Sequence, residues 1–311
     1  MIVHRGHPET WDPPAGGSAV AIGVFDGVHR GHQHVLAALD AAPEYSKVVL
    51  TFGTHPAAAL SPQGAPPKLT TLKERLALFA AAGVDRVGIL DFDDEMIAMA
   101  PEAFVQRVLV NALDARLVVV GEGFRFGNKA EGTTDTLIEL GRTYGFEVAV
   151  VPILSDGGNE IRSTAIREAI AAGDVERAAE LLGRPYVIRG IVVPGEGRGR
   201  TIGVPTANIS FPAGLAIPRY GVYAVRVEVD GARLPAVANF GVRPTFGGDD
   251  EVLEVHIIDA DVDIDGREIG AQFVARLRDE QRFDGVDALV EQIQADIETA
   301  RGLLDEVSQT S

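Results

Sequence analysis

Two kinds of hydrophobic pattern divide the chain. Before residue 183, short apolar runs alternate with segments whose apolar positions recur three and four residues apart, as on one face of a helix. The runs predict strands at 18–25, 47–52, 86–90, 116–120 and 146–151. The spaced segments predict helices at 31–42, 72–82, 101–113 and 134–144, with two shorter ones at 164–172 and 175–182. Strands that alternate with helices in this way are typical of an α/β domain with a parallel sheet.

The pattern changes at Gly183, Arg184 and Pro185. From residue 186 to residue 277 the apolar runs are short, and clusters of Gly, Pro and Asp separate them. These runs predict strands at 186–193, 221–229, 236–240, 252–258 and 269–276, which indicate a small antiparallel β-barrel. A long amphipathic helix at 286–304 follows. We therefore expect two domains, 1–183 and 184–311.

Composition limits the function classes. The 311 residues are 46% hydrophobic, which supports a packed core and excludes a disordered chain. The net charge of −17 argues against a protein that binds long nucleic acids, although local basic groups can still hold a mononucleotide. The absence of cysteine excludes disulfides, thiolate metal sites and a cysteine nucleophile. No apolar run approaches the length of a membrane span, so we expect a soluble, cytoplasmic protein without a membrane partner.

The motif GVFDGVHRGH, residues 23–32, joins a predicted strand to a predicted helix through a tight glycine turn. Backbone N–H groups at a helix start face outward and bind phosphate. The imidazoles of His29 and His32 can donate to oxygens that gain charge in a transition state. The alternative is that both histidines only cap the helix; the pair around Gly31 favours the nucleotide site.

Three other loops lie at ends of predicted strands, at 51–56 (TFGTHP), 121–127 (GEGFRFG) and 162–167 (RSTAIR). In a parallel sheet, the loops at the carboxyl edge converge on the ligand. Phe124 and Phe126 are candidates to stack on a ligand ring, and the alternative is that both belong to the core.

The segment RSTAIR contributes three candidate polar side chains. Ser163, Thr164 and Arg167 lie in one of the loops that we expect to converge on the ligand. Each has a structural alternative: Ser163 or Thr164 caps that helix, and Arg167 is a surface arginine.

In the second half, residues 195–208 (GEGRGRTIGVPTAN) combine a glycine-rich loop with arginines. Such a loop lets backbone amides approach phosphate oxygens. The Thr206 hydroxyl and the Asn208 carbonyl are oxygen ligands of the kind that Mg²⁺ accepts. The alternative is a surface loop followed by a turn.

Glu254 and His256 share one face of a predicted strand, because side chains alternate along a strand. A carboxylate there can serve as a general base for a hydroxyl, or it can form a salt bridge with a neighbouring strand. Arg278 and Glu280 lie where the last strand gives way to the final helix.

Together these motifs resemble the bacterial bifunctional riboflavin kinase/FMN adenylyltransferase family, also called FAD synthetase. The resemblance extends from about residue 20 to residue 304. It implies a nucleotidyltransferase-like first domain and a β-barrel flavokinase second domain. Each domain would use ATP and Mg²⁺, with riboflavin and FMN as the other substrates.

The resemblance also implies site residues. In the first domain, His29 and His32 would be catalytic, and ATP would be bound by Gly23, Phe25, Asp26, Gly31, Ser163, Thr164 and Arg167. In the second domain, ATP would be bound by Gly195, Gly197, Arg198, Gly199, Arg200 and Asn208. Thr206 and Asn208 would hold Mg²⁺, Glu254 would be the general base, and Arg278 would lie near the flavin.

The first domain departs from the family at four positions. The family usually has Asp-Pro at Gly53 and Thr54, Asp or Asn at Gly123, and Ser at Arg162. These departures motivate two alternatives to a bifunctional enzyme: a riboflavin kinase with an altered first domain, and a non-catalytic flavin- or nucleotide-binding regulator. The complete set of kinase motifs argues against the regulator.

Overall fold

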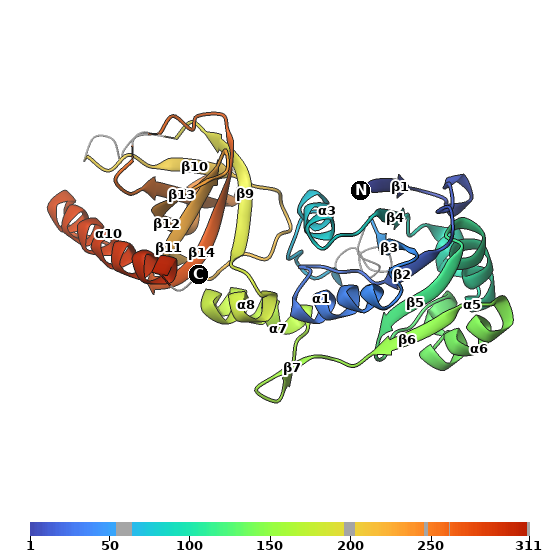
Figure 1. Ribbon diagram of the computed structural model, residues 1–311. Coiled ribbons are helices and arrows are strands. Elements are labelled where there is room, and N and C mark those ends of the chain that lie inside the picture. Colours follow the sequence, from blue (N-terminus) through green and yellow to red (C-terminus); the bar gives the residue numbers. More distant parts are fainter. Residues whose placement is uncertain (54–63, 196–202, 246–247, 261, 310–311) are drawn as a thin grey trace. The chain divides into compact units, whose positions relative to one another are not determined.

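The chain forms two compact units, Met1–Ser163 and Thr164–Ser311. The computed structural model describes residues 1–53, 64–195, 203–245, 248–260 and 262–309. Figure 1 shows a parallel sheet with helices in the first unit and a β-barrel with a long terminal helix in the second. The predicted fold class is therefore confirmed for both units.

A six-stranded parallel sheet organises the first unit. Its strands lie in the order β1-β4-β3-β2-β5-β6. Their bounds are β1 Ile2–Arg5, β2 Ser18–Ile22, β3 Ser46–Phe52, β4 Arg86–Leu90, β5 Ala115–Gly121 and β6 Glu147–Val151. All five residues of β2 are buried, because both faces of this central strand are covered. The strand order reverses at β2. In open α/β sheets, ligands bind at the carboxyl edge where the order reverses.

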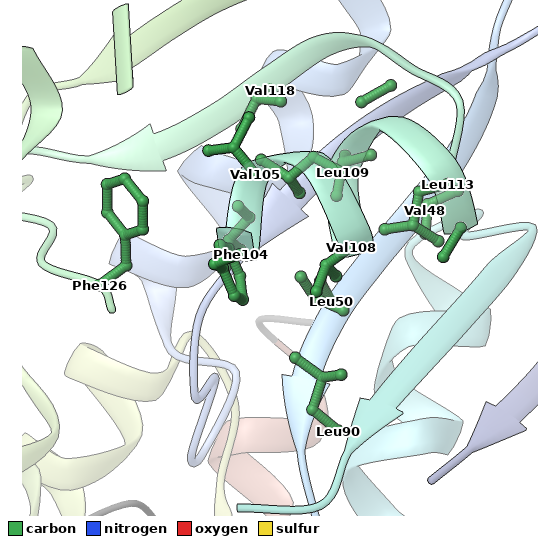
Figure 2. Packing of buried hydrophobic residues seen from close by; sticks show 14 of the residues in the cluster. Val48, Leu50, Leu90, Phe104, Val105, Val108, Leu109, Leu113, Val118 and Phe126 are labelled. Atoms are coloured by element: carbon green, nitrogen blue, oxygen red, sulfur yellow. The ribbon is translucent and has the colours of Figure 1, made fainter. Parts of the chain in front are cut away.

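Helices pack on both faces of this sheet. They are α1 Arg30–Ala37, α3 Leu72–Ala81, α4 Asp94–Ala98, α5 Pro101–Phe104 and α6 Thr134–Tyr144, with a π-helical segment at Val105–Ala112 and 3₁₀ turns at Pro8–Thr10, Ala38–Ala41 and Asn128–Ala130. Figure 2 shows Val105, Val108 and Leu109 against the sheet. A separate cluster with Phe25, Leu36 and Phe79 fills the other face. A short hairpin, β7 Ser155–Asp156 and β8 Asn159–Glu160, precedes the second unit.

Two helices, α7 Ser163–Ala172 and α8 Val175–Leu182, stand between the sheet and the barrel in sequence. Along the sequence, the boundary between the units falls between Ser163 and Thr164, so α8 and nearly all of α7 belong with the barrel. Helix α8 packs on β9 and β14. The expected cap is present, since the Asp174 carboxylate accepts the Arg177 N–H at 2.9 Å.

Six antiparallel strands close the barrel in the order β10-β13-β12-β11-β14-β9. Their bounds are β9 Tyr186–Val193, β10 Ala207–Ser210, β11 Gly221–Val229, β12 Ala232–Thr245, β13 Gly248–Ile257 and β14 Glu268–Arg278. The terminal helix α10, Val286–Gln309, packs on β11, β12 and β14. Its buried side chains Ile297, Ala300 and Leu304 form a cluster with the barrel wall.

Candidate active sites

A cavity of about 440 Å³ lies between the barrel wall and α10. It brings together three of the predicted site residues, Thr206, Glu254 and Arg278. His256 also lines it, as strand alternation from Glu254 predicts. The kinase motifs therefore converge on one cavity although they are far apart in sequence.

Strand pairing arranges the polar groups of this cavity. Asn208 on β10 and Asn239 on β12 are both register partners of Glu254 on β13. Directly opposite residues of antiparallel strands point to the same side, so these three side chains form a row across the wall. Asn208 is buried, and an added Cβ at Gly195 would lie 2.2 Å from its amide nitrogen. Gly195 is thus required for the close approach of its backbone to Asn208.

His256 ties β13 to the segment before β10. Its Nδ1 lies 2.8 Å from the carbonyl oxygen of Pro205. A carbonyl oxygen only accepts, so Nδ1 carries the proton in this contact. The bond holds Thr206, the next residue, beside the strand that carries Glu254.

Arg278 makes a two-pronged ion pair with Asp296 of α10. The Arg278 Nε lies 3.0 Å from both carboxylate oxygens, and one Nη lies 2.8 Å from Oδ2. The Gln292 amide donates to the same carboxylate at 2.9 Å. Because the pair is largely buried, it fixes the arginine at the cavity wall and ties α10 to the barrel.

Sequence analysis missed several residues of this cavity. Asn239 lies in the predicted strand 236–240 but was given no role, and the lining also includes Phe283, Leu289, Ile293 and Asp296. A polar residue between Ala238 and Phe240, both buried, was the available signal for Asn239. Asp296 gave no local signal, because its partner is 18 residues away. Gly197, Arg198, Gly199 and Arg200 lie outside the described residues.

In the first unit, the motif at residues 23–32 folds as a strained turn. The strand ends at Ile22, before the predicted limit, because Phe25 adopts φ +54°. Val28 has φ +38°, which is rare for a β-branched residue and marks backbone strain. An added Cβ at Gly23 would lie 3.1 Å from the Phe25 ring, which packs edge-on against His32 and Phe79. Phe25 therefore lies in the core beneath the turn.

Buried hydrogen bonds hold this turn in place. The Asp26 carboxylate accepts the Leu69 N–H at 3.0 Å and the Thr70 N–H at 3.2 Å. The Thr70 hydroxyl in turn accepts the Gly27 N–H at 3.1 Å. Ser163 donates to the Asp26 carbonyl at 3.2 Å, which links the RSTAIR segment to the turn. These contacts give Asp26 and Ser163 a positioning role.

The two histidines lie together at the start of α1. The rings of His29 and His32 stack with centroids 3.6 Å apart. His29 is the N-cap, and its Nδ1 accepts the His32 N–H at 3.3 Å, so the neutral ring carries its proton on Nε2. An added Cβ at Gly31 would lie 3.1 Å from the His29 ring and 3.2 Å from the Ile161 carbonyl. Glycine is needed there for the close approach of these two segments.

The aromatic candidates in the loop after β5 differ in burial. Phe126 is 7% exposed and belongs to the core, as Figure 2 shows, whereas Phe124 is half-buried and stacks on it at 5.6 Å. Phe126 thus matches the structural alternative. Gly123 has φ +79° with no atom within 4 Å of an added Cβ, and Gly53 has ordinary φ.

Three of the remaining predicted residues lie at or near the surface. Arg162 is exposed and pairs with Glu160 at 2.5 Å. Thr164 is exposed and Arg167 is partly exposed on α7. Thr54 lies outside the described residues.

Two family models match the chain in sequence order. The FAD synthetase model matches residues 12–165, and the riboflavin kinase model matches residues 182–304. Curated relatives named bifunctional riboflavin kinase/FMN adenylyltransferase cover both. The protein from Escherichia coli K12 is 40% identical over 305 residues, covering 97% of each chain, and that from Bacillus subtilis 168 is 34% identical over 291 residues, covering 91% of each.

A crystal structure described as a macrolide-efflux protein from Streptococcus pneumoniae superposes with a TM-score of 0.88 at 34% identity. It covers 97% of this chain and 99% of that one. Within the described part of this chain, no helix is long and apolar enough to cross a membrane. Both halves of the chain are matched by a catalytic family model, which favours two activities over a kinase alone. The chain belongs to the bifunctional riboflavin kinase/FMN adenylyltransferase family.

Proposed function

We propose that the enzyme phosphorylates riboflavin to FMN in the barrel cavity and adenylylates FMN to FAD at the strained turn of the first unit. Membership of the family supports both activities. The observation that carries the kinase assignment is the convergence of Thr206, Glu254 and Arg278 on one cavity. We also propose a cytoplasmic location and small molecules as its partners, without nucleic acid or membranes; the net charge of −17 argues against binding of long nucleic acids.

In the kinase step, the terminal hydroxyl of riboflavin attacks the γ-phosphorus of ATP. An O–P bond to riboflavin forms, the bond to the β-phosphate oxygen breaks, and ADP leaves. Glu254 accepts the hydroxyl proton, and Arg278 orients the flavin beside it. The Gly195 backbone, which lies close against Asn208, would approach the ATP phosphates.

Mg²⁺ fits the donor set of the barrel. Within the described residues no group of three or more His, Cys, Asp or Glu side chains is gathered for a metal. Thr206 and Asn208 instead offer neutral oxygens on the face that carries Glu254, which suits an ion that keeps water and phosphate ligands. When bound, Mg²⁺ would neutralise phosphate charge.

In the adenylyltransferase step, a phosphate oxygen of FMN attacks the α-phosphorus of ATP. The new bond forms FAD, the bond from the α-phosphorus to the bridging oxygen breaks, and pyrophosphate leaves. The attacking phosphate is already ionised, so this site requires no general base. His29 and His32 donate to the phosphates, with Ser163, Thr164 and Arg167 from the RSTAIR segment. Phe124, which keeps part of its ring exposed, is the flavin contact that we favour.

Incubation with riboflavin, ATP and Mg²⁺, followed by chromatography of the flavins, tests both activities. We expect FMN first and FAD later. FMN without FAD would leave only the kinase, and unchanged riboflavin would contradict both assignments. A parallel reaction started from FMN isolates the second step.

We retain 184–311 as the proposed kinase domain, and a longer fragment tests its limit. The side chains of Val175, Ala178 and Leu181 on α8 are buried, and an added Cβ at Gly173 would meet Arg276 of β14 at 2.7 Å. We expect fragment 184–311 to phosphorylate riboflavin, and fragment 164–311 to do so with a higher melting temperature. Equal melting temperatures would show that α7 and α8 add nothing to the barrel. An insoluble or inactive 184–311 beside an active 164–311 would move the boundary to residue 164.

A further inference from the structure

Arg75 of α3 is buried although arginine is nearly always exposed in proteins. Its exposed fraction is 7%. One Nη donates to the carbonyl of Val24 at 2.5 Å, and the other donates to the carbonyl of Phe52 at 3.1 Å. A single guanidinium therefore bridges the segment that leaves β2 and the last residue of the neighbouring strand β3.

Both carbonyls lie beyond the residues that pair β2 with β3, although Phe52 still pairs with Leu90 of β4. The β2–β3 ladder ends at Ile22 and Leu50. Past that point, the Thr51 hydroxyl also donates to the Val24 carbonyl, at 3.1 Å. Arg75 and Thr51 thus replace the missing ladder at the edge where the strained turn begins.

The negative charge of Asp26 partly compensates the buried positive charge of Arg75. Burial lowers the pKa of the Arg75 guanidinium, and the negative charge of Asp26 opposes that shift. Arg75, Asp26, Gly53 and Thr70 line a small cavity of about 50 Å³ at the carboxyl ends of β2 and β3. A buried cation is costly, and an apolar side chain could fill such a position without that cost. The donors, rather than the volume, explain why an arginine stands here.

We propose that Arg75 is a positioning residue of the adenylyltransferase site. It holds Val24 and Phe52 at a fixed spacing, and through Val24 it sets the path of the turn that carries His29 and His32. Its hydrogen bonds go to main-chain carbonyls. A lysine keeps the charge but offers one nitrogen, so it does not reproduce the planar two-donor bridge. This inference rests on the proposed function of the first unit.

The test compares Arg75→Lys and Thr51→Val with Lys73→Gln, a control at an exposed cation of the same helix. FAD formation from FMN and ATP is measured as kcat and KM, with riboflavin kinase activity and the melting curve of each full-length variant. We expect Arg75→Lys to lower kcat about 10- to 100-fold with little change in KM, since misplacement of about 1 Å has effects of this size. Thr51→Val should lower the kcat of FAD formation several-fold. The riboflavin kinase activity should be unchanged in all three variants.

A normal kcat in Arg75→Lys would overturn the inference, and so would a rise in KM alone. If Arg75→Lys fails to fold in the first unit, Thr51→Val decides, and a wild-type kcat there overturns the inference. Should the wild type make no FAD from FMN, the proposed function itself fails. Wild-type FAD synthesis with fully active variants removes only the role of Arg75.

Discussion

The two candidate sites are built from different parts of the chain. In the barrel, Glu254, Asn239 and His256 project from strands, and their relative positions follow from ladder register. In the first unit, the turn at residues 23–29 positions His29 by positive φ angles and buried hydrogen bonds to the backbone. A site borne on strands depends on pairing that extends over the whole barrel. A site borne on a turn depends on a few local contacts, so single substitutions beside it should alter geometry more readily.

The largest expected effect concerns the barrel site. Glu254→Gln keeps the shape of the side chain but removes the proton acceptor, so FMN formation should fall about 10²- to 10⁴-fold. FAD formation from supplied FMN should not change, because Glu254 lies in the other unit. Flavin chromatography of both reactions provides the measurement. An unchanged kinase turnover would favour the salt-bridge alternative for Glu254.

The matching change in the turn is His32→Ala. Loss of a donor to developing charge typically costs about 10²- to 10³-fold in kcat, and FAD formation should fall by that amount. The loss also removes the stacking partner of His29 and the edge contact of Phe25. His32→Asn, which keeps a donor in a smaller side chain, should retain more activity than alanine. FAD synthesis that is insensitive to both changes would exclude the motif from catalysis.

Much of this contrast follows from how each site is encoded. Alternation placed Glu254 and His256 on one face, and the cavity lining agrees. The apolar run at 18–25 overextended the strand that forms β2, since no hydrophobic pattern reports the positive φ of Phe25 and Val28. Strand β1 was missed because Ile2 and Val3 are exposed on an edge strand and give no buried alternation. Strand β10 was missed because it is only four residues long.

Contacts between residues far apart in the sequence were also not predicted. The pair between Arg278 and Asp296 and the bridge from Arg75 to Val24 and Phe52 join positions that no local window contains. The spacing of apolar residues predicts the helix at 72–82 but assigns no role to Arg75. Only the assembled sheet gives this arginine two carbonyl oxygens to bind.

A smaller effect in the barrel separates positioning from proton transfer. His256 binds the Pro205 carbonyl through Nδ1. The amide nitrogen of asparagine lies at a similar reach to Nδ1, whereas that of glutamine lies one bond farther out. We expect His256→Gln to lower kinase kcat about tenfold and to raise the Mg²⁺ concentration required, and His256→Asn to stay near wild type. Equal Mg²⁺ titrations for the two variants would show that the bond to Pro205 does not position Thr206.

The smallest expected effect tests whether the turn-borne site has been weakened by its departures from the family. Gly123 has φ +79° and open space around an added Cβ, so Gly123→Asn places an amide there at modest conformational cost, since asparagine tolerates this region. At Gly53 an added Cβ would make ordinary contacts, 3.5 Å from Ile89 and 3.7 Å from the Asp91 carboxylate. An aspartate at Gly53 would therefore meet like charge, and Gly53→Asp should gain less than Gly123→Asn.

One net hydrogen bond of about 1 kcal/mol corresponds to roughly a fivefold gain in FAD formation for Gly123→Asn, with kinase activity unchanged. Gly123→Ala supplies a control that adds a Cβ without an amide, at a higher backbone cost than asparagine, and it should show no gain. If Gly123→Asn and Gly123→Ala give the same rate of FAD formation, the missing amide at Gly123 does not lower that rate. The first unit would then not need the Asp or Asn side chain that the family usually has at this position.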